Sequence, residues 1–161
     1  MKKLYLVRHA KSSWEFDLED HERPLNERGL NDAKLIGLGL REKLDSVDKI
    51  VSSDALRAQT TAAIITEQLD KKYHKFDLES RLYDFTGDQV VWYIKSTSTT
   101  VNTLLLFGHN HAFTLIANKY GNKFIENVPT AGVVGIKFDI TDWKDISAGE
   151  TFLTLFPKSL R

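Results

Sequence analysis

The residues of this sequence best suited to chemistry are two arginines and two histidines, which lie in three separate segments of the chain. Each segment comes shortly after an apolar run of the kind that forms a strand buried on both faces. Because the carboxyl ends of parallel strands meet at one edge of a sheet, we expect the four side chains to converge there. The set consists of Arg8, His9, Arg57 and His109.

Such a cluster predicts phosphate chemistry. Two guanidinium groups offer planar forks of donors that suit a doubly charged phosphate, and helix N-termini just after the strands would add backbone N–H groups. A histidine among these cations is expected to stay neutral, because neighbouring positive charge disfavours its protonation. A neutral imidazole is a competent nucleophile toward phosphorus, and a phosphohistidine intermediate divides one difficult displacement into two easier ones. The residues therefore predict phosphoryl transfer through histidine.

The elements that must position this cluster follow from the apolar spacing, in which strands alternate with helices. This order predicts an α/β fold, a three-layer α/β/α sandwich with a mostly parallel central sheet, in a single domain over residues 1–161. Ser52, Ser53 and Asp54 supply N-cap chemistry for the second helix. Strands are expected at residues 4–7, 49–51, 76–78, 104–107, 133–139 and 151–156. Helices are expected at 28–44, 88–95 and 112–120, and the second helix, after its capping residues, extends through Leu69.

Composition narrows the classes of function. Lys and Arg number 22 and Asp and Glu number 22, so the formal net charge is zero and nothing steers the whole molecule toward nucleic acid or a membrane. The absence of cysteine excludes a thiol nucleophile and a disulfide scaffold. No apolar run approaches the length of a secretory signal or a membrane span, so we expect a cytoplasmic protein.

Three motifs carry a resemblance to a known family. Residues 6–10 resemble the Arg-His-Gly signature of the histidine phosphatase superfamily, which has the phosphoglycerate mutase-like fold, with Ala10 where most members have glycine. Residues 52–62 resemble the second motif of the family, in which two serines precede an arginine and a Thr-Ala pair. Residues 108–110 resemble its Gly-His motif.

The short branch that includes the phosphohistidine phosphatase SixA fits best. The runs 8–14 and 20–29 are similar to SixA-type proteins, and the similarity continues through residues 81–83 to 129–131, nearly the whole chain.

This resemblance implies that His9 is the nucleophile and that Arg8, Arg57 and His109 bind and polarise the phosphoryl group. It implies no metal or other cofactor, and a phosphohistidine on a protein as substrate.

Three further residues are candidates for supporting roles. Ser12 and Asn110 stand where they would help to bind phosphate, although Ser12 would equally cap a short helix. Asp84 lies about where larger relatives carry the carboxylate that protonates the leaving group. The alternative for Asp84 is an N-cap to the helix that follows.

For other polar and aromatic residues the sequence gives weaker evidence of a role in the site. His111 forms a His-x-His pair with His109, but no third metal ligand is evident, so a place at the pocket edge or at the helix start is preferred. His21 suits structural hydrogen bonding and a site-edge role equally. Trp14 and Phe16 would either line the pocket or pin their polar loop to the core, and pinning is preferred.

Two other functions remain open. The same His9 chemistry would serve a broad phosphomonoesterase that acts on small phosphorylated metabolites. A different class of protein, a phosphate- or phosphoprotein-binding module without turnover, would need the same cationic cluster.

Overall fold

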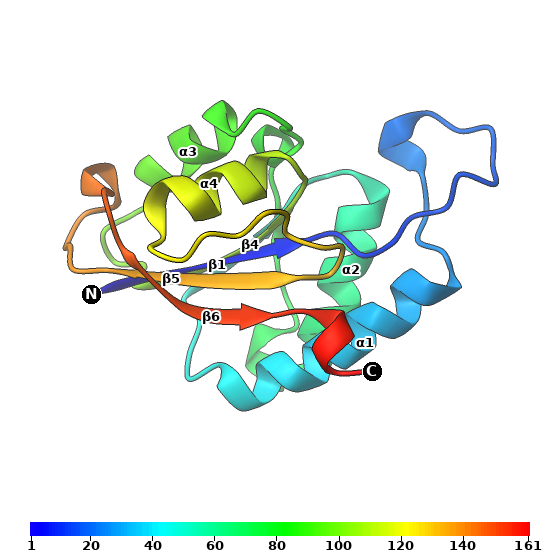
Figure 1. Cartoon of the computed structure of the whole chain (residues 1–161), viewed down its shortest axis with the longest axis horizontal. Coiled ribbons are helices and arrows are strands. Elements are labelled where there is room, and N and C mark those ends of the chain that lie inside the picture. Colours follow the sequence, from blue (N-terminus) through cyan, green and yellow to red (C-terminus); the bar gives the residue numbers. More distant parts are fainter.

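The computed structural model describes residues 1–161 and shows one six-stranded sheet in the order β3-β2-β4-β1-β5-β6 (Figure 1). The first four strands in this order run parallel to one another, whereas β5 and β6 are antiparallel to their neighbours. The predicted mostly parallel sheet is therefore confirmed, with an antiparallel pair at one side. The strands are β1 (Lys2–Arg8), β2 (Lys49–Ser52), β3 (Asp77–Leu78), β4 (Thr103–Gly108), β5 (Val133–Phe138) and β6 (Glu150–Leu155).

Four helices cover the two faces of the sheet, which gives the predicted three layers. In Figure 1, α3 and α4 lie above the sheet and α1 and α2 below it. No helix has the length and apolar character needed to cross a bilayer. The helices are α1 (Glu27–Lys43), α2 (Leu56–Gln68), α3 (Asp88–Lys95) and α4 (Ala112–Tyr120). Short 3₁₀ turns lie elsewhere in the chain, at Asp20–Glu22, Lys71–Tyr73, Ser80–Leu82, Trp143–Asp145 and Pro157–Ser159.

The central strands are apolar on both faces because both faces are covered. Alternate side chains of β1 enter two separate cores: Leu4 and Leu6 pack under α3 and α4, and Tyr5 and Val7 pack against α1 and α2. Each fully buried aliphatic side chain of this kind contributes about 1.5–3 kcal/mol of transfer free energy. This two-sided packing fixes the register of β1, and so fixes where its carboxyl end lies.

The start of α2 differs from the prediction. Helix α1 begins after Asn26, whose side chain accepts the Gly29 N–H at 2.8 Å. Helix α2 instead has Ala55 at its N-cap position and no side-chain cap. The predicted capping by Ser52, Ser53 and Asp54 is therefore wrong: among backbone N–H groups, the Ser53 hydroxyl accepts only that of Ala55 itself, at 3.2 Å, and not one of the first turn.

A glycine at the end of β4 allows α4 to lie close to the strand. A Cβ atom on Gly108 would be 2.6 Å from Cζ of Phe113, far inside van der Waals contact. The absence of a side chain therefore lets the chain turn directly from the strand into α4. This turn carries His109 at the carboxyl edge of the sheet.

Candidate active site

The carboxyl ends of three adjacent strands, β2, β4 and β1, form one site. The backbone of His9 is fixed there on two sides: its N–H donates to the Gly108 carbonyl at 3.0 Å, and its own carbonyl accepts the Ala131 N–H at 3.1 Å. The next N–H, of Ala10, donates to Oγ1 of Thr61 at 2.9 Å. The imidazole of His9 is thus held in place by α2, β4 and the segment before β5.

The His9 ring is neutral and presents one free nitrogen. Nδ1 lies 2.7 Å from the Ala10 carbonyl oxygen, and since a carbonyl can only accept, Nδ1 carries the proton and Nε2 the lone pair. Burial is the largest cause that lowers the pKa of His9, to about 3, and the positive charges of Arg57, Arg8 and Arg23 lower it further. From the sequence we expected neighbouring cations to keep His9 neutral. Loss of hydration on burial lowers its pKa more than the cations do.

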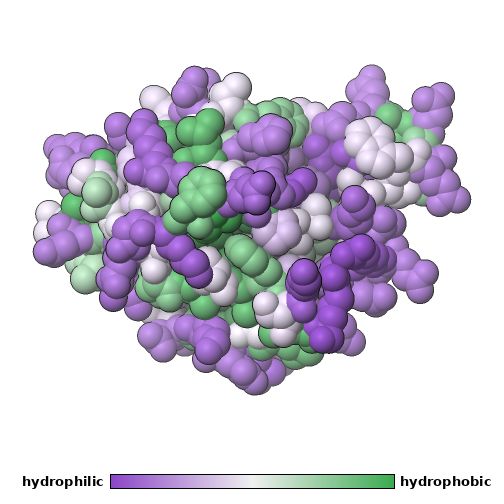
Figure 2. Space-filling model, in the orientation of Figure 1, coloured by the Kyte–Doolittle hydropathy of each residue, from purple (hydrophilic) through white to green (hydrophobic).

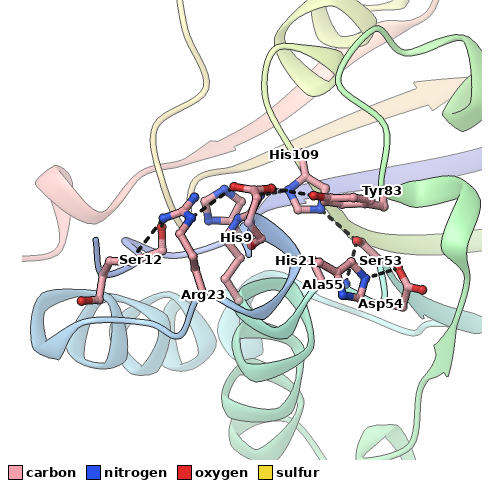
Figure 3. Close-up of polar contacts among 12 residues, drawn as sticks. His9, Ser12, His21, Arg23, Ser53, Asp54, Ala55, Tyr83 and His109 are labelled. Atoms are coloured by element: carbon pink, nitrogen blue, oxygen red, sulfur yellow. Dashed lines mark hydrogen bonds and ion pairs between the residues drawn. The ribbon is translucent and has the colours of Figure 1, made fainter. Parts of the chain in front are cut away.

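His109 is a second neutral ring in the same cluster. Its Nε2 lies 2.8 Å from Oγ of Ser53, and its Nδ1 lies 3.5 Å from Nη2 of Arg57. Because a guanidinium can only donate, Nδ1 is the acceptor and Nε2 carries the proton. Burial, followed by the neighbouring His9 and Arg57, lowers the pKa of His109 to about 2. The rings of His9 and His109 are 5.3 Å apart between centroids (Figure 3).

Arg57 and Arg8 bring buried donors to the site. Arg57 donates from Nη1 to the Asp20 carbonyl at 2.6 Å and from Nη2 to the Asp20 carboxylate at 2.9 Å. Arg8 donates from Nη1 to the Val128 carbonyl at 2.8 Å. The Nε atoms of both arginines are buried and have no hydrogen-bond partner in the protein. Buried donors are almost always paired, so this geometry fits a site that takes an anion.

Asp20 is a member of the site to which the sequence interpretation assigned no role. Its carboxylate accepts from Nε of Arg23 at 3.1 Å, from the Tyr83 hydroxyl at 2.6 Å and from Arg57. Partial burial alone would raise the pKa of Asp20, but hydrogen bonds from Tyr83, Arg57 and Arg23 outweigh it and hold that pKa well below its ordinary value. Asp20 is therefore an anion bound to two guanidinium groups of the site.

We expect Asp20→Asn to bind inorganic phosphate more tightly, by about 10-fold or about 1.4 kcal/mol. The wild-type carboxylate competes for Arg57 and repels an incoming anion, and the amide does neither. Calorimetric titration with phosphate at constant ionic strength measures the change. Asp17→Asn, a neighbouring exposed carboxylate without an ion pair, is the control for loss of one charge. Equal or weaker binding by Asp20→Asn would refute the competition.

Arg8, His9 and Arg57 line a pocket of about 240 Å³, whereas His109 is fully buried and lies outside its lining. Ser12 and Asn110 both lie in the pocket wall, but their side chains are already engaged. Oγ of Ser12 accepts from Nη1 of Arg23 at 2.6 Å, and Oδ1 of Asn110 accepts from the Thr114 hydroxyl. Their predicted contacts with phosphate stay predictions. The pocket is lined by Arg8, His9, Lys11, Ser12, Trp14, Asp20, Arg23, Arg57, Phe85, Asn110 and Thr130.

Asp84 lies outside this lining, and the structure gives it a different role from the predicted acid. Its buried carboxylate accepts the backbone N–H groups of Gly87 at 3.1 Å, Gln89 at 3.0 Å and Val90 at 3.2 Å. These donors belong to the start of α3, so Asp84 caps that helix, which is the alternative that the sequence left open. The neighbouring Phe85 faces the pocket instead.

We expect Asp84→Ala to lower the free energy of unfolding by about 1–3 kcal/mol, because buried N–H groups at the start of α3 lose their acceptor. Turnover of an aryl phosphate per folded molecule is expected to stay within about 2-fold, since no acid of the site is removed. Urea unfolding and steady-state kinetics measure the two quantities. A stable variant with a large loss of kcat would restore Asp84 as the proton donor.

His21 and His111 lie at the edge of the site. Nε2 of His21 is 3.0 Å from the Asp54 carboxylate, and its ring packs edge-on against Tyr83, so it supports the wall of the site. His111 occupies the N-cap position of α4 but makes no side-chain cap. No group of three or more His, Asp or Glu side chains is placed to hold a metal ion.

The preferred prediction, that Trp14 and Phe16 pin their loop to the core, is wrong, whereas the alternative, that they line the pocket, holds for Trp14. Their side chains are 76% and 55% exposed. The guanidinium of Arg23 lies 3.6 Å from the centroid of a Trp14 ring, so the indole stacks on a cation at the pocket mouth.

The neutral histidines predict a pH-dependent stability. The pKa of His9 falls from 6.5 to about 3 on folding and that of His109 from 6.5 to about 2, so the unfolded chain binds more protons between these values. The contribution of these two histidines to the free energy of unfolding is therefore full above pH 6.5. It is lost as the pH falls, by about 1 kcal/mol for each histidine at about pH 5.5. Urea unfolding across this range checks the loss, and His9→Gln should show about half of it. An unchanged free energy of unfolding would contradict the neutral pair.

The sequence of this chain is similar to one known family and to uncharacterized proteins of a bacterium and a plant. The sequence family described as histidine phosphatase superfamily (branch 1) matches residues 4–89. An uncharacterized protein of Mycobacterium tuberculosis is 30% identical over 153 residues, which cover 89% of this chain and 93% of that protein. An uncharacterized chloroplastic protein of Arabidopsis thaliana is 31% identical over 118 residues, which cover 68% of this chain and 54% of that protein.

Solved structures share the fold. The protein histidine phosphatase SixA, in complex with tungstate, matches with a TM-score of 0.82 at 17% identity, covering 99% of both chains. A candidate phosphohistidine phosphatase SixA of Agrobacterium tumefaciens matches with a TM-score of 0.76 at 22% identity, covering 96% of this chain and 97% of the other. At these identities the likeness shows the α/β fold.

Proposed function

Since this chain belongs to the histidine phosphatase superfamily, branch 1, we propose that it is a phosphatase that passes the phosphoryl group from its substrate to His9 and then to water. We propose further that the natural substrate is a phosphohistidine carried by a protein. The observation that carries the first proposal is the lone pair on Nε2 of His9, set among buried guanidinium donors.

The first step forms a bond between Nε2 of His9 and phosphorus and breaks the bond from phosphorus to the leaving group, which departs with the electron pair. The Ala10 carbonyl keeps the proton on Nδ1 and stabilises the positive ring that forms. In the second step a water oxygen attacks phosphorus, the P–N bond breaks and His9 regains its lone pair. The proton that the water gives up to solvent balances the proton that the leaving group takes from solvent.

The phosphoryl oxygens would be held by Arg8 and Arg57, whose Nε donors are unpaired in the free protein. His109 accepts from Arg57 in the free site, so it would donate to a phosphoryl oxygen only after taking up a proton. Binding of a phosphate dianion beside His109 favours protonation of its ring. Donors fixed before the reaction stabilise the developing charge without reorganising.

The substrate class is inferred from the leaving group that the pocket can serve. The one carboxylate in the lining, Asp20, is held ionised by three donors, so it is not a ready acid. An alkoxide from a sugar phosphate needs a strong proton donor, whereas the imidazole of phosphohistidine leaves from a labile P–N bond with less help. This contrast favours phosphohistidine over a small phosphate ester.

Relative rates test the proposal. We would measure kcat/KM on a histidine-phosphorylated peptide, on para-nitrophenyl phosphate and on a sugar phosphate. We expect the phosphohistidine to react about 100-fold or more faster than the sugar phosphate. Faster turnover of the sugar phosphate would favour the metabolite phosphatase. A wild-type protein that binds phosphate tightly but turns over none of the three would be a binding module.

A further inference from the structure

The loop that follows β1 and His9 projects from the carboxyl edge of the sheet, at the upper right of Figure 1. We call residues 13–19 of this loop the arm. Residues 14–19 alternate apolar and acidic side chains, a pattern typical of a half-buried strand, yet this segment forms no strand and joins no sheet.

The apolar side chains of the arm face solvent. Trp14 is 76% exposed, Phe16 55% and Leu18 45%. Single exposed apolar residues are ordinary, but three within five positions form a cluster of the kind that marks an interaction site. Figure 2 shows green and pale atoms among purple ones on the lobe at the upper right.

The acidic side chains of the arm are also without partners. Glu15, Asp17 and Glu19 are exposed, and the ion pairs of the chain include none of them. They give the arm a negative field directly beside a pocket built for an anion. A free phosphate anion gains nothing from that field, whereas a protein with cationic residues near its phosphoryl group does.

Both ends of the arm are tied to the phosphoryl pocket. The Ser13 N–H donates to the Pro24 carbonyl at 2.8 Å, and Trp14 stacks on Arg23 in the pocket wall. After the arm, Asp20 binds Arg57. A partner seated on the arm would therefore have its adjoining residues at the pocket mouth.

We propose that the arm docks the phosphoprotein substrate, and that it selects a segment with apolar and basic residues beside the phosphorylated one. This inference rests on the proposed function. Phe16 and Leu18 would bury apolar surface against the partner, and Glu15, Asp17 and Glu19 would pair with its cations.

Three synthetic phosphohistidine peptides test the proposal, with flanks of leucine and lysine, of leucine and glutamate, or of glycine and serine. We expect wild-type kcat/KM to be about 10-fold higher on the leucine–lysine peptide than on the other two. The double variant Phe16→Ser/Leu18→Ser should lose most of the advantage over the glycine–serine peptide, through KM. It should keep the preference for lysine over glutamate and its rate on para-nitrophenyl phosphate. Glu15→Gln/Asp17→Asn/Glu19→Gln should lose only the preference for lysine over glutamate.

A matched control removes an exposed aromatic elsewhere: Phe124→Ser, at a side chain 81% exposed outside the pocket lining, should change no ratio. Binding of the labelled peptides to His9→Ala proteins, with and without the arm substitutions, decides the docking role even if wild type hydrolyses nothing. Failure of hydrolysis alone would reject the proposed function, and equal binding with and without the substitutions would reject the arm. A dimer that depends on Phe16 and Leu18 would also overturn the proposal, because the occupant would be a second copy.

Discussion

His9→Ala is expected to lower kcat by about 10⁴-fold or more on every phosphorylated substrate, because it removes the only atom placed to form the covalent intermediate. The surrounding donors remain, so phosphate binding should change by less than about 10-fold. Stopped-flow release of phosphate measures the rate, and calorimetry measures the binding. Together they separate loss of the nucleophile from loss of the pocket.

The control for this variant is His74→Ala, at an exposed histidine whose Nε2 bonds only the Leu69 carbonyl. It should keep the wild-type rate. If His9→Ala retained more than a few per cent of the wild-type kcat, water rather than His9 would be the attacking group, and the two-step account would be wrong.

Arg57→Lys should be nearly as damaging, with kcat/KM reduced about 10²- to 10³-fold, although the charge is kept. The guanidinium uses one nitrogen for the Asp20 carbonyl, another for the Asp20 carboxylate and a third, Nε, that is buried and unpaired. A lysine ammonium is a point donor on a flexible stem and cannot reproduce this fork. Steady-state kinetics over a range of substrate concentrations would show the loss.

Arg41→Lys, an exposed arginine on α1, is the matched control and should leave kcat/KM unchanged. Full activity of Arg57→Lys would mean that charge alone matters at this position. In that case the fork geometry would have no part in transition-state binding.

Much of the fold was predictable because its signals are local. The apolar runs that became β1 and β4 are buried on both faces, and the helices at residues 88–95 and 112–120 have the predicted bounds. The convergence of His9 with His109 followed from one rule about the carboxyl ends of parallel strands. That rule needs only the order of strands and helices, which apolar periodicity supplies.

The parts of the site that were missed depend on how a loop returns to the sheet. Asp20 and Arg57 are 37 positions apart in the sequence, and no pattern within the loop predicts their contact. Trp14 was expected to pin its loop to the core rather than to line the pocket, but it stacks on Arg23 in the pocket wall. Asp84 was ambiguous between acid and cap, and only the direction of its carboxylate toward α3 separates the two.

Phosphoryl transfer through His9 requires a covalent bond between phosphorus and Nε2 of His9. Rapid quenching of wild-type protein during turnover, followed by mass spectrometry under alkaline conditions that preserve phosphohistidine, would reveal it. We expect one phosphoryl group, located at His9 and lost on mild acid treatment. A phosphoryl group on any other residue, or turnover with inversion at phosphorus and no covalent intermediate, would contradict transfer through His9.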